Sequence, residues 1–138
     1  MSTSSRKGKA KIVIVDDSVI ALEYTRQVLQ EAGYVVVASD LSVGFSALMM
    51  REQPDLALVD LRMPAIQGDK LVQIIRGNRR NECPIVLYSD RPEAELIERA
   101  ELCGADGYIC KTGDGQQLIQ RVEQFLAGRK VGTVRRPP

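Results

Sequence analysis

The sequence predicts an α/β fold, a five-stranded parallel sheet doubly wound by five helices, and three observations point to it. Short runs rich in Val, Ile and Leu alternate five times with longer segments that carry apolar residues at helical spacing. The runs are apolar along most of their length, as strands buried on both faces are. The regular strand–helix spacing makes neighbouring strands parallel, with right-handed crossovers between them.

Five runs are predicted to be strands because they are short, rich in apolar and β-branched residues, and bounded by Gly, Pro or Asp. In chain order they are Lys11–Val15, Tyr34–Ala38, Asp55–Val59, Pro84–Tyr88 and Asp106–Cys110. Periodicity alone does not determine the order of these strands within the sheet.

Five helices are expected after the strands, and most are bounded by a capping or breaking residue. Their ranges are about 18–32, 42–52, 68–79, 92–103 and 114–127. The first begins at Ser18, a good N-cap residue, and its apolar residues Ile20, Tyr24 and Val28 recur every four positions. Pro92 suits the first position of the fourth helix. A glycine or proline follows four of the five: Gly33, Pro54, Gly104 and Gly128.

The absence of histidine removes several classes of functional site. It excludes His-based general acid–base catalysis, Ser-His-Asp triads and His-ligated metals. Cys83, Cys103 and Cys110 form no CxxC pair, and we interpret them as small buried hydrophobic residues in a reducing compartment. No apolar run approaches the ~20 residues of a membrane span. We therefore expect a cytoplasmic protein with no membrane partner.

The net charge of +1 hides an uneven distribution, because residues 12–128 carry 11 basic and 18 acidic residues, a net charge of −7. Residues 1–11 and 129–138 each carry four basic residues and no acid. An acidic body with basic ends is not typical of a nucleic-acid-binding domain. We expect one domain at 11–128, flexible basic tails at 1–10 and 129–138, and no nucleic-acid partner for the domain.

Polar and charged side chains follow four of the predicted strands. They are Asp16, Asp17, Asp60, Ser89, Asp90 and Lys111. In parallel α/β sheets the carboxyl ends of the strands meet at one edge, where ligands bind. Three carboxylates gathered there would repel one another. Mg²⁺ resolves that repulsion, because it binds a few carboxylates and retains several waters.

These residue types together form a phosphoryl-transfer site. Asp60 would be the nucleophile, Lys111 would bind one phosphate oxygen, and Ser89 would donate a hydrogen bond to another. The product would be an aspartyl phosphate. Each residue alone has a structural explanation, as a turn residue, a helix cap or a solvated lysine. Their joint occurrence at four strand ends favours the functional explanation.

Four segments resemble the receiver domains of two-component response regulators, the CheY-like family. They are IVIVDD at 12–17, DLALVDLRMP at 55–64, PIVLYS at 84–89 and GADGYICK at 104–111, and the resemblance covers about residues 10–128. It implies the flavodoxin-like strand order 2-1-3-4-5. It also implies a signalling domain rather than an enzyme, with only self-directed phosphotransfer and autodephosphorylation.

The resemblance further implies a donor, a cofactor and a role for each site residue. The donor would be a histidine kinase or phosphotransfer protein, and the downstream protein target is unknown. Phosphorylation would change the protein-binding surface through a pair of switch residues. Asp60 would be the phosphoacceptor, Lys111 the phosphate-binding residue, and Ser89 and Tyr108 the switch pair. The Mg²⁺ ligands would be Asp16, Asp17, Asp60 and the backbone carbonyl of Arg62.

Thr112 and Asp90 depart from the usual pattern of the family, and Arg62 and Arg91 stand at positions where its members vary. Thr112 stands where most members have proline, usually after a cis peptide bond. We expect either a trans bond with a re-routed 111–115 loop or a strained cis bond. Arg62 and Arg91 flank the path of the hydrolytic water, where each either pairs with the phosphoryl group and slows its loss or pairs with a surface acid. Asp90 adds a further acid beside the site.

Parts of the sequence are also compatible with other functions. A pseudo-receiver that acts only as a protein-binding module, and a receiver fragment of a longer regulator, remain alternatives. A phosphatase of the haloacid-dehalogenase type would need a second Asp where Arg62 stands. A flavodoxin would need a hydroxyl- and glycine-rich phosphate loop after the first strand, where the sequence has Asp16–Asp17–Ser18.

Overall fold

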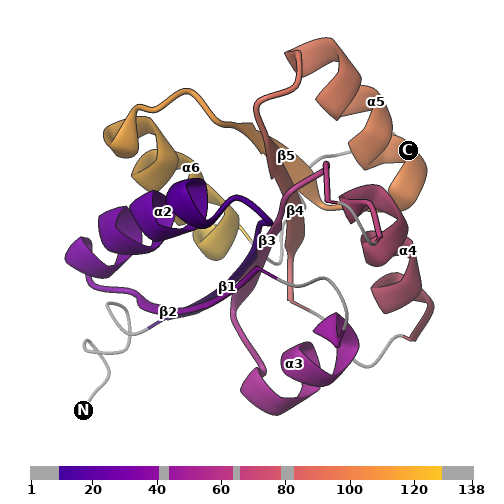
Figure 1. The fold of residues 1–138 in the computed structure, drawn as a ribbon, viewed down its shortest axis with the longest axis horizontal. Coiled ribbons are helices and arrows are strands. Elements are labelled where there is room, and N and C mark those ends of the chain that lie inside the picture. Colours follow the sequence, from indigo (N-terminus) through magenta and orange to yellow (C-terminus); the bar gives the residue numbers. More distant parts are fainter. Residues whose placement is uncertain (1–9, 41–43, 64–65, 79–82, 129–138) are drawn as a thin grey trace.

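Five parallel strands form one sheet with helices on both faces (Figure 1). The computed structural model describes residues 10–40, 44–63, 66–78 and 83–128. The strands are β1 (Lys11–Val15), β2 (Val35–Ser39), β3 (Leu56–Val59), β4 (Ile85–Ser89) and β5 (Gly107–Cys110). The helices are α2 (Val19–Glu31), α3 (Phe45–Glu52), α4 (Gly68–Asn78), α5 (Glu93–Cys103) and α6 (Gly115–Ala127).

The strands lie in the order β2-β1-β3-β4-β5, and every neighbouring pair is parallel. The predicted α/β class and the strand order implied by the family resemblance are therefore both confirmed. This order places β1 and β3 side by side at the centre of the sheet, with β4 and β5 beyond β3. As a result, the loops that follow β1, β3, β4 and β5 all open at the same edge.

Alternate residues of each central strand enter two separate cores, because successive side chains of a strand point to opposite faces. In β1, Ile12 and Ile14 pack with α2 and α6, whereas Val13 and Val15 pack with α3, α4 and α5. All four are fully buried. Figure 1 shows the same division, with α2 and α6 covering one face and α3, α4 and α5 the other.

Of the apolar residues that recur every four positions on α2, only Val28 packs against the core. Ile20 is 83% exposed and Tyr24 is 43% exposed, whereas the helix buries Leu22, Thr25 and Leu29. At about 100° per residue, Ile20 lies about 160° around the helix from Leu22, so the two cannot face the same core. The sequence carries two overlapping apolar stripes on this helix, and packing against the sheet selects the second.

Two further expectations need correction. The edge strand β2 is not buried on both faces, because Val35 is exposed and the rest of the strand is half-buried. Among the cysteines only Cys103 is buried, while Cys83 and Cys110 are half-buried at the margin of one core. No disulfide joins the three cysteines, as expected.

The predicted strand and helix bounds agree with the structure to within one residue, except at the start of α3. This helix begins at Phe45, three residues later than predicted, because Gly44 adopts a left-handed conformation with φ of 88° as its N-cap. Pro92 is the N-cap of α5 rather than its first residue. Ala10 directly precedes β1, and its carbonyl accepts a hydrogen bond from the Val35 N–H of β2 at 3.0 Å. Several predicted features lie outside the described residues. They are the helix ends at Ser42 and Arg79, Pro64 in the loop after Asp60, and the tails at 1–9 and 129–138. Within the described ranges, no helix is both long and apolar enough to cross a membrane.

Gly107 should be a stability-determining position of the sheet. A Cβ added there would lie 2.5 Å from Cζ of Phe125, an aromatic ring buried in the core. Gly107→Ala should therefore lower the free energy of unfolding by about 1–3 kcal/mol, measured by urea denaturation. The matched change Gly115→Ala places its Cβ 3.4 Å from Tyr24 and Val28, an ordinary contact. It should stay within about 1 kcal/mol of wild type, and equal stability of the two variants would contradict this account.

Candidate functional site

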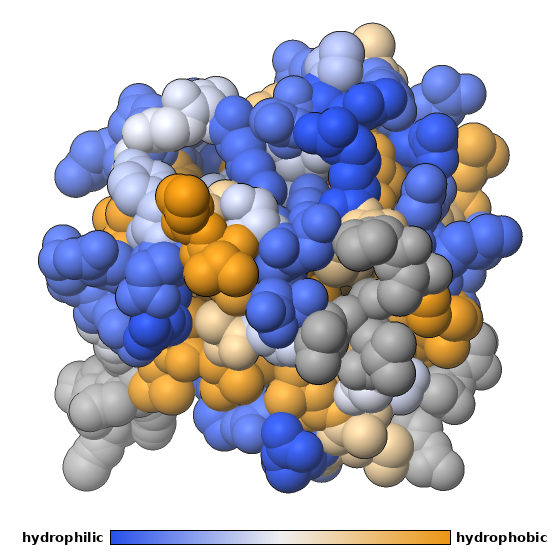
Figure 2. All heavy atoms as spheres, viewed as in Figure 1, coloured by the Kyte–Doolittle hydropathy of each residue, from blue (hydrophilic) through white to orange (hydrophobic). Residues whose placement is uncertain are grey.

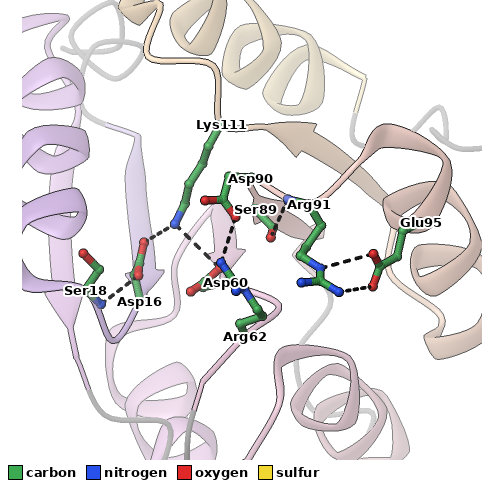
Figure 3. Close-up of polar contacts among 9 residues, drawn as sticks. All are labelled: Asp16, Ser18, Asp60, Arg62, Ser89, Asp90, Arg91, Glu95 and Lys111. Atoms are coloured by element: carbon green, nitrogen blue, oxygen red, sulfur yellow. Dashed lines mark hydrogen bonds and ion pairs between the residues drawn. The ribbon is translucent and has the colours of Figure 1, made fainter.

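The predicted site residues meet at the carboxyl edge of the sheet. Asp16 and Asp17 follow β1, Asp60 follows β3, Ser89 ends β4 and Lys111 follows β5. Figure 3 shows Lys111 reaching towards Asp16 and Asp60, with Ser89 beside them. Residues up to 95 positions apart in the chain thus contact one another.

Three carboxylates form a cluster that could hold a metal ion. One oxygen from each of Asp16, Asp17 and Asp60 lies within 4.8 Å of the others. Asp16 and Asp60 are buried, at 1% and 7% exposure, and Asp17 is exposed. Two buried carboxylates and one solvent-facing carboxylate suit a hard divalent cation that keeps water on its open side. The donor set therefore fits Mg²⁺.

The loop after β1 fixes the orientation of Asp16. The Ser18 N–H donates to Asp16 Oδ1 at 2.9 Å, and Ser18 Oγ in turn accepts from the Ala21 N–H at 3.3 Å as the N-cap of α2. The aspartate is thereby held between the strand end and the first turn of the helix. Its second oxygen, Oδ2, remains directed at Lys111.

Lys111 is the cation that faces the carboxylates. Its Nζ lies 2.6 Å from Asp16 Oδ2 and 3.6 Å from Asp60 Oδ1. Burial alone would lower the pKa of Lys111, but the hydrogen bond that it donates to Asp16 and the negative charge of Asp60 outweigh this effect, so the pKa of Lys111 is raised. The ammonium therefore stays charged and partly offsets the negative charge of the cluster.

Asp60 is the carboxylate with the most strongly altered acidity. Its pKa rises from 3.8 to about 6, first because burial disfavours the charged form, and further because Asp16 and Asp17 repel it. Lys111 opposes the rise but does not cancel it. A buried carboxylate that is costly to ionise in the metal-free protein becomes a competent nucleophile once a cation compensates the neighbouring charges.

Gly68 is a site residue whose role the sequence analysis missed. It begins α4, and its N–H donates to the Leu61 carbonyl at 2.9 Å. A Cβ added at this position would overlap the backbone carbonyl of Asp60. Only glycine lets the helix start so close to the Asp60 backbone. The position of Gly68 eight residues after Asp60 is the one sequence signal of this contact.

The expected switch residues Ser89 and Tyr108 occupy different environments. Ser89 is fully buried, and its Oγ accepts a hydrogen bond from the Arg91 N–H at 3.3 Å. Tyr108 is half-buried, and its hydroxyl donates to Glu93 Oε2 at 2.7 Å. That hydrogen bond, followed by burial, raises the pKa of Tyr108. The guanidinium of Arg121 also lies 5.9 Å from the Tyr108 ring centre.

Both arginines near the site pair with acids. Arg62 lies 3.2 Å from Asp90, so the extra acid beside the site is balanced by a cation from the loop after β3. Arg91 binds Glu95 through two hydrogen bonds of 3.1 and 3.2 Å and points away from Asp60 (Figure 3). The Arg62–Asp90 pair is well exposed and therefore easily exchanged.

The loop after Lys111 follows the trans alternative, because the Lys111–Thr112 peptide bond is not cis. Tyr24 of α2 donates its hydroxyl hydrogen to the Gly113 carbonyl at 3.0 Å. Asp114 caps α6 by accepting from the N–H groups of Gln116 and Gln117. These contacts hold a loop that lacks the usual proline.

Comparison with known proteins places these observations in a family. A family model described as the response regulator receiver domain matches residues 12–123. The nitrate/nitrite response regulator protein NarL of Escherichia coli strain K12 is 30% identical over 133 residues, which cover 92% of this chain and 59% of NarL. Protein PilH of Pseudomonas aeruginosa is 26% identical over 120 residues, covering 86% of this chain and 99% of PilH.

A solved structure agrees with the sequence matches. A CheY-like response regulator receiver domain protein from Methanospirillum hungatei superposes with a TM-score of 0.78 at 25% identity, covering 88% of this chain and 97% of that one. The chain spans about half the length of the first curated relatives that it matches, from 48% to 59%.

The raised pKa of Asp60 predicts a pH-dependent effect of Asp60→Asn. Between pH 3.8 and about 6 the folded protein holds a proton that the unfolded chain has released, so wild-type stability falls as pH rises through this window. The variant removes the buried charge. In metal-free buffer it should be more stable than wild type by roughly 2–3 kcal/mol near pH 8, with no advantage below about pH 4.

Urea denaturation at a series of pH values, with a chelator present, measures this difference. Asp90→Asn is the matched control, because its carboxylate is exposed and paired with Arg62. It should shift stability by less than about 1 kcal/mol at any pH. A destabilising effect of Asp60→Asn at pH 8 would contradict the prediction that the buried charge of Asp60 lowers the stability of the metal-free protein.

Proposed function

The chain belongs to the response regulator receiver domain family of two-component signalling, and on that premise we propose that it is a phosphoacceptor modified on Asp60. The observation that carries the proposal is the position of Lys111 Nζ, 2.6 Å from Asp16 and 3.6 Å from Asp60. An ammonium held beside a buried carboxylate and two further acids matches the requirements of phosphoryl transfer. The donor would be a histidine kinase or a phosphotransfer protein.

The chemical step needs one oxygen of Asp60 as nucleophile. A bond forms between this oxygen and phosphorus as the bond from phosphorus to the donor's imidazole nitrogen breaks. Lys111 would bind one phosphoryl oxygen through its ammonium, and Ser89 would turn its hydroxyl to donate to another. The reverse of the signal is hydrolysis of the aspartyl phosphate by water, an activity directed at the protein itself.

Mg²⁺ is the proposed cofactor, held by the carboxylates of Asp16, Asp17 and Asp60 and by the backbone carbonyl of Arg62. When bound, it would neutralise negative charge on the carboxylates and on the phosphoryl oxygens. The support for this assignment is the 4.8 Å cluster of carboxylate oxygens, two of them from buried residues. Lys111 and Mg²⁺ would together balance a site that otherwise carries three negative charges.

Two exposed hydrophobic residues support a protein as donor. Val19 and Ile20, in the first turn of α2, are 62% and 83% exposed and are separated from Asp17 in the chain by Ser18 alone. Figure 2 shows a group of hydrophobic side chains over α2, surrounded by hydrophilic ones. Exposed apolar side chains next to a reactive carboxylate suit a docking partner that presents its own apolar face.

The proposed output is a change at Ser89 and Tyr108. Rotation of Ser89 towards the phosphoryl group would release the Arg91 N–H that its hydroxyl now binds. Tyr108 would leave Glu93 and turn inward, altering the surface formed by α5, β5 and α6. Phosphorylation then acts as a population shift between two arrangements, and a protein target responds to one of them.

The proposal extends to the whole regulator in two versions. The match over 99% of PilH supports a regulator that consists of a receiver domain alone. The match to 59% of NarL supports the alternative of a receiver portion within a longer regulator. We favour the first version, with a cytoplasmic location.

Acetyl phosphate with Mg²⁺ should label the wild-type protein on a single residue. Asp60→Asn should abolish labelling, and Lys111→Ala should slow it about 10- to 100-fold, because a hydrogen bond from a charged group is lost. Intact-mass spectrometry against time measures both effects. Asp90→Asn serves as the control that should label at nearly the wild-type rate. Absence of wild-type labelling would instead favour the pseudo-receiver alternative.

Ile20→Asp should separate docking from chemistry. The donor for this test is a phosphorylated histidine kinase domain that labels the wild type. Ile20→Asp should slow phosphotransfer from it about tenfold, because one apolar contact in an interface is worth about 1–2 kcal/mol. Labelling by acetyl phosphate should stay unchanged, since this small donor needs no docking surface. Met50→Asp on α3, also an exposed hydrophobic residue, is the matched control. Equal slowing with both donors would exclude a docking role for Ile20.

A further inference from the structure

Tyr88 is a buried tyrosine one residue before the end of β4, and its hydroxyl needs a partner inside the core. The side chain is 5% exposed and packs on the face of the sheet that α2 and α6 cover. Its hydroxyl shares a hydrogen bond of 3.2 Å with Thr25 Oγ1 of α2, a residue 1% exposed. Burying two hydroxyl groups costs free energy that an aliphatic pair would avoid. This cost calls for a physical reason beyond packing.

The Tyr88 ring faces the ammonium of Lys111. Lys111 Nζ lies 5.3 Å from the ring centre, within the ~6 Å range of a cation–π contact. An ammonium carries three N–H donors. The nitrogen lies 2.6 Å from a carboxylate oxygen of Asp16 and 3.6 Å from one of Asp60. The ammonium therefore has two carboxylates and one aromatic ring as close neighbours.

Lys111 needs such support because its four-carbon stem is flexible. Its backbone is tied to β4 by the hydrogen bond from Lys111 N–H to the Ser89 carbonyl at 2.8 Å. That bond leaves the torsions of the side chain free. The Tyr88 ring limits where the ammonium can lie, and Thr25 holds the far end of the ring from α2. A path of contacts thus runs from α2 through Tyr88 to the ammonium.

We propose that Tyr88 and Thr25 are positioning residues for Lys111, which hold its ammonium where it binds a phosphoryl oxygen. The proposal rests on the proposed function for the role of Lys111, but the placement of the ammonium can be measured without phosphorylation. Neither Tyr88 nor Thr25 touches the phosphoryl group, so each acts through Lys111. A simple packing role would instead require only the volume of the ring.

Three variants and a matched control separate these explanations. Tyr88→Leu removes the ring, Tyr88→Phe removes only the hydroxyl, and Thr25→Val removes the partner of that hydroxyl. Tyr34→Phe is the control, because Tyr34 packs against the same core beside the first residue of β2, away from the carboxyl edge. Thermal unfolding verifies that each variant is folded under the conditions of the assays.

The first readout is the NMR shift of the Lys111 side-chain methylene protons. The ring current of Tyr88 should displace these signals in wild type and in Tyr34→Phe, and Tyr88→Leu should return them towards ordinary lysine values. The second readout is the affinity for beryllofluoride, a phosphoryl analogue, measured by calorimetry with Mg²⁺ present. Tyr88→Leu should weaken this affinity about 3- to 30-fold, the range of a desolvated cation–π contact.

The remaining variants should show intermediate effects. Tyr88→Phe and Thr25→Val keep a ring near Lys111 but release its far end, so each should weaken beryllofluoride binding about two- to fivefold, the loss of one ordinary hydrogen bond. Tyr34→Phe should bind as wild type does. If Tyr88→Leu does not fold, Tyr88→Phe and Thr25→Val decide the question.

Wild-type affinity together with wild-type Lys111 shifts in the folded Tyr88 and Thr25 variants would overturn the inference. Failure of the proposed function gives a different result, because wild type itself would then bind no beryllofluoride and accept no phosphoryl group from acetyl phosphate. The NMR shifts of the Lys111 methylene protons would then be the only test of the positioning role. Equal shifts in wild type and Tyr88→Leu would exclude that role.

Discussion

The crowding of like charges around Asp60 is the constraint on which the rest of the structure depends. Asp16 and Asp60 are buried within 4.8 Å of each other and of Asp17, and the pKa of Asp60 rises to about 6 as a result of burial and of this repulsion. Such an arrangement costs folding free energy, which the ammonium of Lys111 partly offsets. The same charges that destabilise the metal-free site would favour the divalent cation that we propose for it.

The sheet supplies the rigidity that this crowding requires. β1 and β3 are adjacent central strands whose apolar side chains are fully buried, so packing holds the backbone from which the carboxylates extend. Gly68 brings the start of α4 against the Asp60 backbone and closes the loop on its other side. Each acidic side chain thus extends from backbone that is held by packing, which keeps the site preorganised.

Several features around this site are particular to the chain. Thr112 replaces the usual proline, and Tyr24 holds the following loop through the Gly113 carbonyl. Asp90 adds a negative charge beside the site, and Arg62 from the neighbouring loop pairs with it. In both cases a long-range contact accompanies a local departure from the usual pattern, and the carboxylates of Asp16, Asp17 and Asp60 remain clustered.

The sequence by itself determined the α/β class, the strand and helix bounds to within about one residue apart from the start of α3, and the set of polar residues at the strand ends. These are local properties, since periodicity, capping and turn chemistry operate over a few neighbouring positions. Only the tertiary structure decided which stripe of α2 is buried, and that Lys111 lies closer to Asp16 than to Asp60. It also decided that Tyr88 bonds Thr25. These outcomes depend on contacts between residues 63 to 95 positions apart and on competition between alternative apolar faces, which no local pattern records.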